Sequence, residues 1–296
     1  MPPNNNNLLL LLDFDTTITQ SDTLASLVTL SIAALPATTP AQKTALTNLW
    51  SEIVRDYLAA HAAHRAAYRP PAEERTTLAE ELDFLESVAG VERASVARVG
   101  KAGFFRGLDE GVLEGVGRRA VALGRGEGGD ENGDGDGDGD GEVEVGVRVR
   151  KGFGELLERY GDGGKGWDAA VVSVNWSGAF IKGAVEAGSG GRGIKRVVSN
   201  EIGFPDGMVE GPPELGKKPL TTAGDKLRAM ESLKTGLAEE RVVYFGDSAT
   251  DLACLVGADL GVIMADDGET KLLKLLARIG FEVPHVQEAR EGNKMV

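Results

Sequence analysis

The pattern of hydrophobic and polar residues divides the first half of this chain into one strand and a series of helices. Residues 8–12 are five consecutive leucines, and such a short, wholly apolar run is typical of a strand covered on both faces of a sheet. Apolar residues then recur at helical spacing over 46–58 and again over 78–89, where Gly90 is expected to end the helix. No strand-like run occurs between residues 20 and 140, so an all-helical block is predicted directly after the first strand.

A different pattern, in which short apolar runs alternate with amphipathic ones, begins after residue 143. It predicts strands at 169–174, 196–199, 242–245 and 260–264, and helices at 153–160, 180–187, 223–237 and 249–256. Strands that alternate with helices favour a parallel sheet with right-handed crossovers. The sequence therefore predicts an α/β fold whose first strand is separated from the others by the helical block.

One segment of unusual composition separates the two patterns. Residues 124–142 contain five Asp and three Glu against a single Arg, with glycine at most other positions. Such a segment cannot bury apolar surface and is expected to be a disordered linker. An EF-hand calcium loop starting at Asp130 is disfavoured because Gly141 stands where the loop needs Glu. The predicted domains are core at 1–20, helical block at 21–123, acidic linker at 124–142 and core at 143–296.

Charge and cysteine content narrow the class of protein. The net charge of −14 argues against nucleic-acid binding and against docking on an anionic membrane. No apolar stretch approaches the roughly 20 residues of a membrane helix, and no secretory signal pattern is visible. Cys254 is the only cysteine, which suits a reducing compartment. We therefore expect a cytoplasmic protein without nucleic-acid or membrane partners, while the composition leaves its oligomeric state open.

Two carboxylates follow the leucine strand at the position where open α/β sheets place their chemistry. Asp13 and Asp15 can divide the work there, one as nucleophile and one as proton donor and acceptor. The segment from Asp13 to Thr17 resembles the first motif, Asp-x-Asp-x-Thr, of the haloacid dehalogenase (HAD) superfamily. Phosphatases of that superfamily usually carry glycine where this chain has Thr16. We expect the motif to tolerate Thr16, although this residue has a Cβ that glycine lacks and that can restrict the turn.

Two further segments resemble the second and third HAD motifs. Ser173 follows an apolar run, and the resemblance implies that its hydroxyl binds the transferred phosphoryl group, with Asn175 as a further contributor. Lys226 starts a predicted helix 21 positions before Asp247, a separation similar to that in the family. Its ammonium would counter the charge on the phosphoryl oxygens and on Asp13. Competing lysines are Lys217, Lys218 and Lys234.

The segment around Asp247 resembles the fourth HAD motif, Gly-Asp-x-x-x-Asp, whose last position is Asp251. The resemblance implies a Mg²⁺ site in which the side chains of Asp13 and Asp247 and the main-chain carbonyl of Asp15 are ligands. Asp251 would either ligate the ion or orient the other ligands. Together the motifs imply a Rossmann-like parallel sheet core with an inserted all-helical cap domain, as in the phosphoserine-phosphatase-like branch.

The function implied by this resemblance is a Mg²⁺-dependent phosphatase that hydrolyses a small phosphorylated metabolite through an aspartyl-phosphate. One alternative is a phosphotransferase or mutase that uses the same chemistry, and another is a catalytically silent binding protein on the same fold. Charged cap residues are candidates for contacting the leaving group: Glu52, Arg55, Arg65, Arg69, Lys101 and Arg106. Trp50 and Tyr57 are expected to be core residues of the cap.

Overall fold

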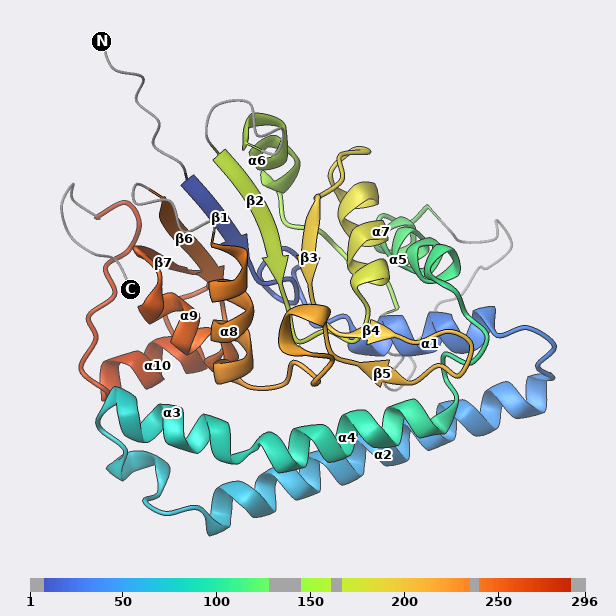
Figure 1. Ribbon diagram of the computed structural model, residues 1–296, viewed down its shortest axis with the longest axis horizontal. Helices are drawn as coiled ribbons and strands as arrows, with labels where there is room; N and C mark the ends of the chain where they lie inside the picture. The colour runs from blue at the N-terminus through green and yellow to red at the C-terminus, as the bar shows by residue number, and fades with distance from the viewer. Residues whose placement is uncertain (1–7, 128–144, 161–166, 235–239, 289–296) are drawn as a thin grey trace, which may run out of the picture.

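A five-stranded parallel sheet forms the centre of the molecule (Figure 1). The computed structural model describes residues 8–127, 145–160, 167–234 and 240–288, so the acidic linker predicted at 124–142 lies outside them except for 124–127. The strand order is β3-β2-β1-β6-β7. The bounds are β1 Leu8–Leu12, β2 Trp167–Val172, β3 Arg196–Val198, β6 Arg241–Gly246 and β7 Leu260–Ile263. The predicted α/β fold class is confirmed.

The leucines of β1 supply both hydrophobic cores of the protein. Side chains alternate between the two faces of a strand, so Leu10 and Leu12 face one core while Leu9 and Leu11 face the other. Each of these four leucines is at most 4% exposed, because β1 is the central strand and pairs with β2 on one side and β6 on the other. This explains why an unbroken apolar run is needed at these positions rather than an alternating pattern.

Helices cover both faces of the sheet. The core that contains Leu10 and Leu12 is covered by α1 (Leu24–Ala34), α5 (Glu110–Gly124), α6 (Phe153–Tyr160) and α7 (Gly178–Gly188). The core that contains Leu9 and Leu11 is covered by α8 (Ala223–Leu233), α9 (Leu252–Gly257) and α10 (Lys271–Arg278). Cys254 is fully buried in α9, as a small apolar residue would be. The α10 helix was not predicted.

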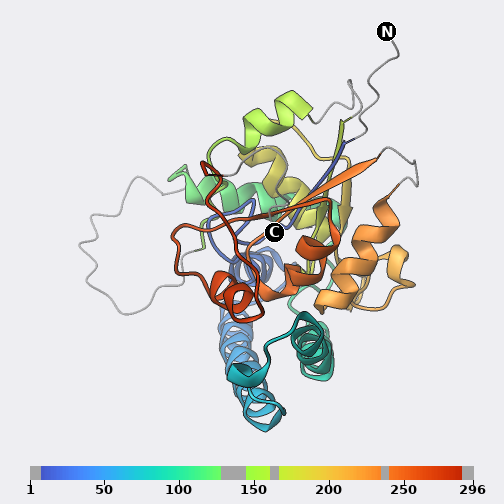
Figure 2. The ribbon, with the colours of Figure 1, turned by 90° about the vertical axis from the view of Figure 1, so that its left-hand side faces the viewer.

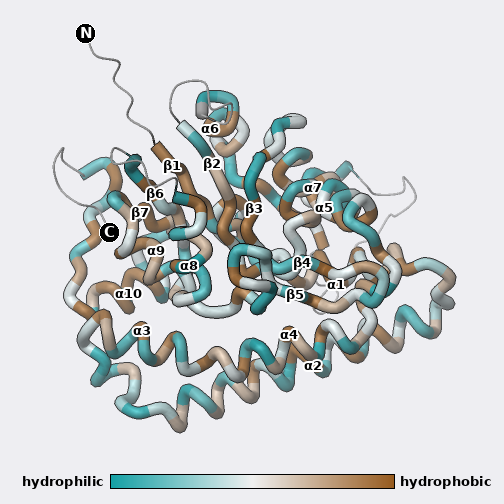
Figure 3. Tube along the Cα trace, in the orientation of Figure 1, coloured by the Kyte–Doolittle hydropathy of each residue, from teal (hydrophilic) through white to brown (hydrophobic). Residues whose placement is uncertain are grey.

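Three helices of the inserted block lie beyond the carboxyl ends of the strands. They are α2 (Pro40–Ala67), α3 (Leu78–Ser87) and α4 (Ala89–Ala102), with a short 3₁₀ turn, η1 (Ala72–Glu74), before α3 (Figure 1). Figure 2 shows them projecting below the rest of the molecule. In Figure 3 they are mixed in hydropathy, whereas β1 is uniformly hydrophobic. Among the described residues, no helix combines the length and apolar character needed to cross a membrane.

The range predicted for the helical cap, 21–123, also contains α1 and α5, which pack on the core around the sheet. The chain leaves this core after α1 and returns to it before α5. The points at which the chain leaves and re-enters this core lie next to each other, since a Cβ added to Gly107 would lie 3.6 Å from the ring of Pro36. The helices α2 to α4 therefore form an excursion whose two ends lie side by side.

A small antiparallel hairpin, which the sequence did not reveal, supports α4. It consists of β4 (Glu201–Ile202) and β5 (Val209–Glu210) and is followed by a 3₁₀ turn, η2 (Pro213–Leu215). Met208 of the hairpin packs so closely on α4 that a Cβ at Gly100 would lie 3.2 Å from its methyl carbon. Strands of two residues carry too little periodicity to be recognised in a sequence.

The prediction that Gly90 ends a helix is wrong. The break comes earlier, at Val88, and Gly90 lies inside the first turn of α4. No heavy atom outside its own chain neighbourhood lies within 4 Å of a Cβ built at Gly90, so its lack of a side chain serves no close contact. Glycine in a helix costs only about 1 kcal/mol relative to alanine, and the packing of α4 against α2 outweighs it.

Two glycines allow α5 and α7 to pack backbone to backbone. A Cβ at Gly183 would lie 2.0 Å from the carbonyl oxygen of Glu114, and one at Gly117 would lie 2.2 Å from that of Phe180. Both distances are far below van der Waals contact, so a side chain at either position would force the helices apart.

We expect Gly183→Ala to lower the free energy of unfolding by about 1–3 kcal/mol through overpacking. Gly115→Ala is the matched control, because no atom lies within 4 Å of a Cβ built there. It should raise stability by about 0.5–1 kcal/mol through helix propensity. Urea denaturation of both variants measures the difference, and equal effects would contradict the close packing of the two helices.

Candidate active site

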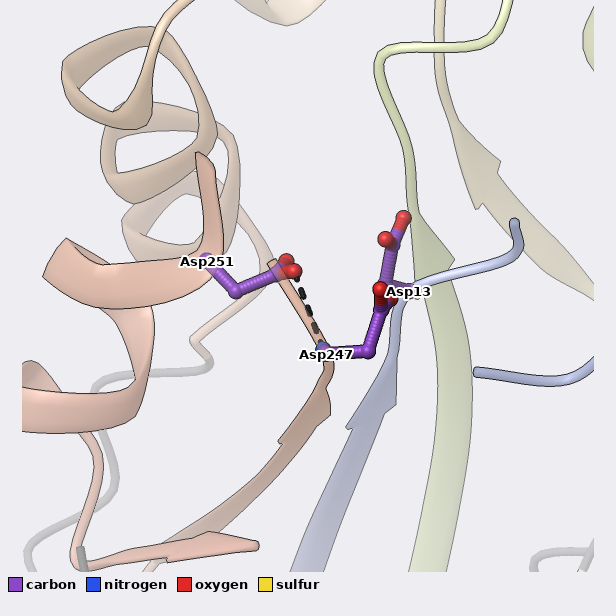
Figure 4. Close-up of side chains that lie close together, drawn as sticks. All are labelled: Asp13, Asp247 and Asp251. Carbon is purple, nitrogen blue, oxygen red and sulfur yellow. Dashed lines mark hydrogen bonds between the residues drawn. The ribbon is translucent and has the colours of Figure 1, made fainter. Parts of the chain in front are cut away.

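The ends of β1 and β6 bring two carboxylates together. These strands are adjacent and parallel, with Leu12 opposite Phe245, so Asp13 and Asp247 emerge at the same edge of the sheet. The backbone N–H of Asp13 continues the ladder by donating to the carbonyl of Phe245 over 2.9 Å. Figure 4 shows Asp251 pointing from the 3₁₀ turn η3 (Ala249–Asp251) toward both.

Lys226 is buried between two of these carboxylates. Its Nζ lies 2.8 Å from Oδ1 of Asp13 and 2.5 Å from Oδ1 of Asp251, and the lysine side chain is fully enclosed. The residue sits in the first turn of α8, where a capping box between Thr222 and Asp225 begins the helix. The other predicted candidates point elsewhere, since Lys217, Lys218 and Lys234 pair with Glu210, Asp225 and Glu231.

This arrangement shifts the protonation of both partners. Burial raises the pKa of Asp13 well above its ordinary value and the Asp251 carboxylate raises it further, while Lys226 opposes both effects. Burial alone would lower the pKa of Lys226, but the carboxylates of Asp13 and Asp251 outweigh it and raise that pKa. The lysine is therefore held as a cation against the nucleophile candidate.

Asp251 acts as a clamp that ties the end of β6 to Lys226. Its Oδ2 accepts hydrogen bonds from the backbone N–H groups of Asp247 and Ser248, at 3.2 and 3.1 Å, and from the Ser248 hydroxyl at 2.9 Å. Its Oδ1 accepts from the hydroxyl of Tyr244 at 2.8 Å as well as from Lys226. Both oxygens are therefore already engaged by the protein.

Asp15 is oriented by residues from two other elements. Its Oδ1 accepts from the backbone N–H of Thr23 at 2.8 Å and from the Thr23 hydroxyl at 2.6 Å. Its Oδ2 accepts from Nδ2 of Asn175 at 3.0 Å. Burial and the nearby Asp22 raise the pKa of Asp15 to about 6, against the opposing effect of these hydrogen bonds. A carboxyl with this pKa can both donate and accept a proton near neutral pH.

The loop after β2 carries Ser173 and Asn175. Oγ of Ser173, a buried residue, accepts from the backbone N–H of Asn175 at 3.2 Å. Nδ2 of Asn175 reaches Thr23 as well as Asp15, and Oδ1 of Asn175 accepts from the backbone N–H of Ser177. Of the two predicted site residues on this loop, Asn175 contacts Asp15 directly, whereas Ser173 contacts the backbone of Asn175.

Thr16 adopts a conformation that disfavours its residue type. Its φ is 56°, in the left-handed region that suits glycine, which explains why a glycine is usual in the motif it resembles. Arg150 supports this turn, since its Nη2 and Nε donate to the carbonyl of Thr16 at 2.9 and 3.2 Å. The backbone at Thr16 is therefore strained, and Arg150 holds it in place.

Sequence reasoning missed Thr23, Arg150 and Tyr244. Thr23 had a signal, because a hydroxyl residue directly before an apolar helical run is a typical N-cap. In the structure its hydroxyl makes no cap hydrogen bond and serves Asp15 instead. Arg150 and Tyr244 had no such signal in the sequence. Arg150 lies outside every motif, and Tyr244 looks like an ordinary strand residue.

The donor set suits a hard divalent cation. One oxygen from each of Asp13, Asp247 and Asp251 can be chosen so that all lie within 4.8 Å of one another. Carboxylate oxygens are the ligands that Mg²⁺ prefers. Oδ1 of Asp247 accepts a hydrogen bond from the Thr17 hydroxyl at 3.0 Å, and the Thr16 side chain also hydrogen-bonds to the Asp247 carboxylate. Both carboxylate oxygens of Asp251 already accept hydrogen bonds from protein donors. Asp251 therefore fits the role of orienting Asp247 and Lys226 better than that of a metal ligand.

A cavity of about 740 Å³ adjoins these residues on the side of the helices α2 and α4. It is lined by Asp22, Val174 and Thr250, which are the chain neighbours of Thr23, Asn175 and Asp251. Trp50 and Tyr57, expected as core residues, also line it. A second cavity, of about 790 Å³, lies between β7 and α10 and touches none of the site residues.

No protein-family model matches the sequence, and no curated protein matches it. Among solved structures, a functionally unknown protein from Anaerococcus prevotii is similar with a TM-score of 0.51 and 15% identity, over 98% of this chain and 85% of that one. A substrate-bound phosphoserine phosphatase has a TM-score of 0.45 and 14% identity, over 90% and 88%. A HAD family hydrolase from Salmonella enterica serovar Typhi has 0.42 and 14%, over 94% and 73%. The likeness concerns the fold, and the fold expected from the HAD resemblance is the one observed.

We expect Lys226→Met to lower the free energy of unfolding by about 3–5 kcal/mol, because it leaves two buried carboxylates without their cation. Burial raises the pKa of Asp13, so this carboxylate is protonated, and its buried charge removed, more readily at pH 5 than at pH 8. The loss of stability in the variant should therefore be smaller at pH 5. Lys234→Met, which removes a partly exposed pair with Glu231, should cost less than about 1 kcal/mol. Similar losses in the two variants, measured by chemical denaturation, would contradict this role of Lys226.

Thr16→Gly should raise the free energy of unfolding by about 0.5–1 kcal/mol. Relief of the left-handed strain at φ 56° is worth about 1–2 kcal/mol, and the greater freedom of glycine in the unfolded chain offsets part of it. Thr16→Asn, which tolerates this region, should lie between Thr16→Gly and the wild type. Thermal denaturation of all three proteins tests this order, and a less stable Thr16→Gly would mean that the turn is unstrained.

Proposed function

We propose that this protein is a Mg²⁺-dependent phosphatase that hydrolyses a small phosphomonoester through an aspartyl-phosphate on Asp13. The observation that supports it most strongly is the buried Asp13 carboxylate held against Lys226, 2.8 Å away, beside an Asp15 carboxyl oriented for proton transfer. Phosphoryl transfer relies mainly on positioning and charge neutralisation, and this site offers both.

In the first half of the reaction, an oxygen of Asp13 attacks phosphorus and the ester bond to the leaving group breaks. Lys226 reduces the repulsion between the Asp13 carboxylate and the phosphoryl oxygens. A Mg²⁺ ion held by Asp13, Asp247 and the main-chain carbonyl of Asp15 would add charge neutralisation. Asp251 keeps Lys226 and the end of β6 in place. Ser173 is proposed to bind the phosphoryl group through its hydroxyl.

Asp15 supplies and then recovers the proton. In its protonated form it donates to the departing alkoxide, and as a carboxylate it accepts a proton from the water that cleaves the aspartyl-phosphate. Its pKa of about 6 makes both forms accessible near neutral pH. Thr23 and Asn175 hold the carboxyl in one orientation, so each is a positioning residue for Asp15.

The alternatives remain distinguishable by product. A phosphotransferase or mutase on the same site would pass the phosphoryl group to an alcohol rather than to water. A silent binding protein would show no turnover, and gain of turnover in Thr16→Gly would favour that alternative. A cytoplasmic location fits the single buried cysteine and stays a prediction.

Phosphate release from a panel of phosphomonoesters, measured with Mg²⁺ and with chelator, tests the proposal. Asp13→Asn should reduce release to the background rate, and chelation should do the same to the wild type. Asp56→Asn, an exposed residue on α2, is the control for an Asp-to-Asn change elsewhere and should retain full activity. Release that persists in Asp13→Asn would rule out the aspartyl-phosphate.

The role of Asp15 is tested by leaving-group dependence. Asp15→Asn should lower kcat about 10²–10⁴-fold for an alkyl phosphate, whose alkoxide needs a proton. The rate of the first step should fall far less with p-nitrophenyl phosphate, because nitrophenolate departs unprotonated. A burst of nitrophenolate followed by slow turnover would identify the missing base in the second step. Equal losses of burst and turnover for both esters would instead indicate a structural role for Asp15.

A further inference from the structure

The cavity next to the candidate active site is where the leaving group of a phosphomonoester would lie, and its lining has a definite chemical character. The proposed function, on which this inference rests, makes the cavity the leaving-group pocket. Its lining residues come from the loops at the carboxyl ends of the strands and from the helices α2 and α4. Its volume of about 740 Å³ is within the range of pockets that enclose a whole small molecule.

Most of the lining is apolar or aromatic. The rings of Trp50 and Trp176 meet edge to face with centroids 5.9 Å apart, one from α2 and one from the loop after β2. Tyr57 lies two turns further along α2. Aliphatic residues form much of the remaining surface, among them Leu24, Ile53, Val54, Val96, Val174 and Leu220, and hydroxyl residues such as Ser51 and Ser95 also line it. Aromatic faces that line a pocket attract cations through their negative quadrupole.

The charged residues of the lining are all acidic. They are Asp22, before α1, and Glu92 on α4, whose Oε1 accepts a hydrogen bond from the hydroxyl of Tyr57 at 2.9 Å. None of the described residues that line the cavity is Lys, Arg or His. The basic cap residues that the sequence offered as candidates, Arg55, Arg65, Arg69, Lys101 and Arg106, are absent from the lining. A carboxylate on the leaving group would therefore meet two negative charges and no counter-ion.

We propose that the substrate is a phosphomonoester of an ammonium-bearing alcohol, whose cation lies among Trp50, Tyr57, Trp176, Asp22 and Glu92. The phosphoryl end of such a substrate faces Lys226 and the cation faces the acidic, aromatic wall, so the two ends of a zwitterion meet opposite charges. Burial raises the pKa of both Asp22 and Glu92, because the lining offers these carboxylates no cation, and a bound cation would oppose that effect.

The reaction balances with this substrate. Asp13 forms a bond to phosphorus as the bond from phosphorus to the ester oxygen breaks, and the proton of Asp15 passes to that oxygen to give the ammonium alcohol. Water then attacks the aspartyl-phosphate, inorganic phosphate leaves, and the proton of the water returns to Asp15.

The experiment compares choline phosphate with its uncharged isostere, 3,3-dimethylbutyl phosphate, and with phosphoglycolate, which carries a carboxylate. We expect kcat/KM for choline phosphate to exceed that for the isostere at least about tenfold, with phosphoglycolate the poorest. Glu92→Gln should reduce the ratio between the first two esters several-fold. Glu73→Gln removes the same charge from an exposed position in η1 outside the cavity and should leave the ratio unchanged.

Binding of the product alcohols provides a readout that needs no catalysis. Two of the three tryptophans line the cavity, so their fluorescence should report choline binding, and choline should bind more tightly than 3,3-dimethylbutanol. If choline binds preferentially but no ester is hydrolysed, the cation site stands and the phosphatase proposal fails. If esters are hydrolysed with no preference for ammonium, with a preference for carboxylate, or with a ratio that Glu92→Gln does not change, the cation site is overturned.

Discussion

The ion pairs of one buried lysine hold together the edge of the sheet at which Asp13 and Asp247 emerge. Lys226 belongs to α8, Asp13 to the end of β1 and Asp251 to the turn before α9, so the three side chains join elements that are distant in sequence. Two carboxylates this close repel each other, and their burial makes the repulsion severe. The cation makes their proximity tolerable, and through Asp251 it also fixes the backbone from which Asp247 projects. The positions of Asp13 and Asp247 relative to each other therefore depend on this arrangement.

A second set of contacts holds Asp15, on the other side of the site. Thr23, at the start of α1, and Asn175, after β2, both bind Asp15, so the helix α1 is tied directly to the loop after β1. Asp13, Asp15 and Lys226 thus belong to the core, while α2 and α4 supply much of the wall of the adjoining cavity. Under the proposed function, chemistry and recognition would be assigned to different parts of the chain.

The sequence predicted the sheet and the residues at its edge because both leave strong local signals. Five leucines in a row have few interpretations, and Asp13, Lys226 and Asp247 stand beside strand or helix boundaries that periodicity reveals. Gly90 misled because packing of α4 outweighed a weak helix preference. Arg150 and Tyr244 were missed because their contacts with Thr16 and Asp251 depend on tertiary structure alone. The acidic, aromatic character of the cavity was equally hidden, since its lining comes from separate segments.

The adjoining positions of Pro36 and Gly107 bear on how such a protein can change its specificity. The stretch between them begins and ends at nearly one point, so replacing it with a longer or shorter insert alters the entropy of loop closure only slightly. Helices α1 and α5, which anchor Asp15 and the core, lie outside that stretch. Exchange of the module between residues 36 and 107 would therefore create chimaeras that inherit the reaction from one parent and the choice of substrate largely from the other.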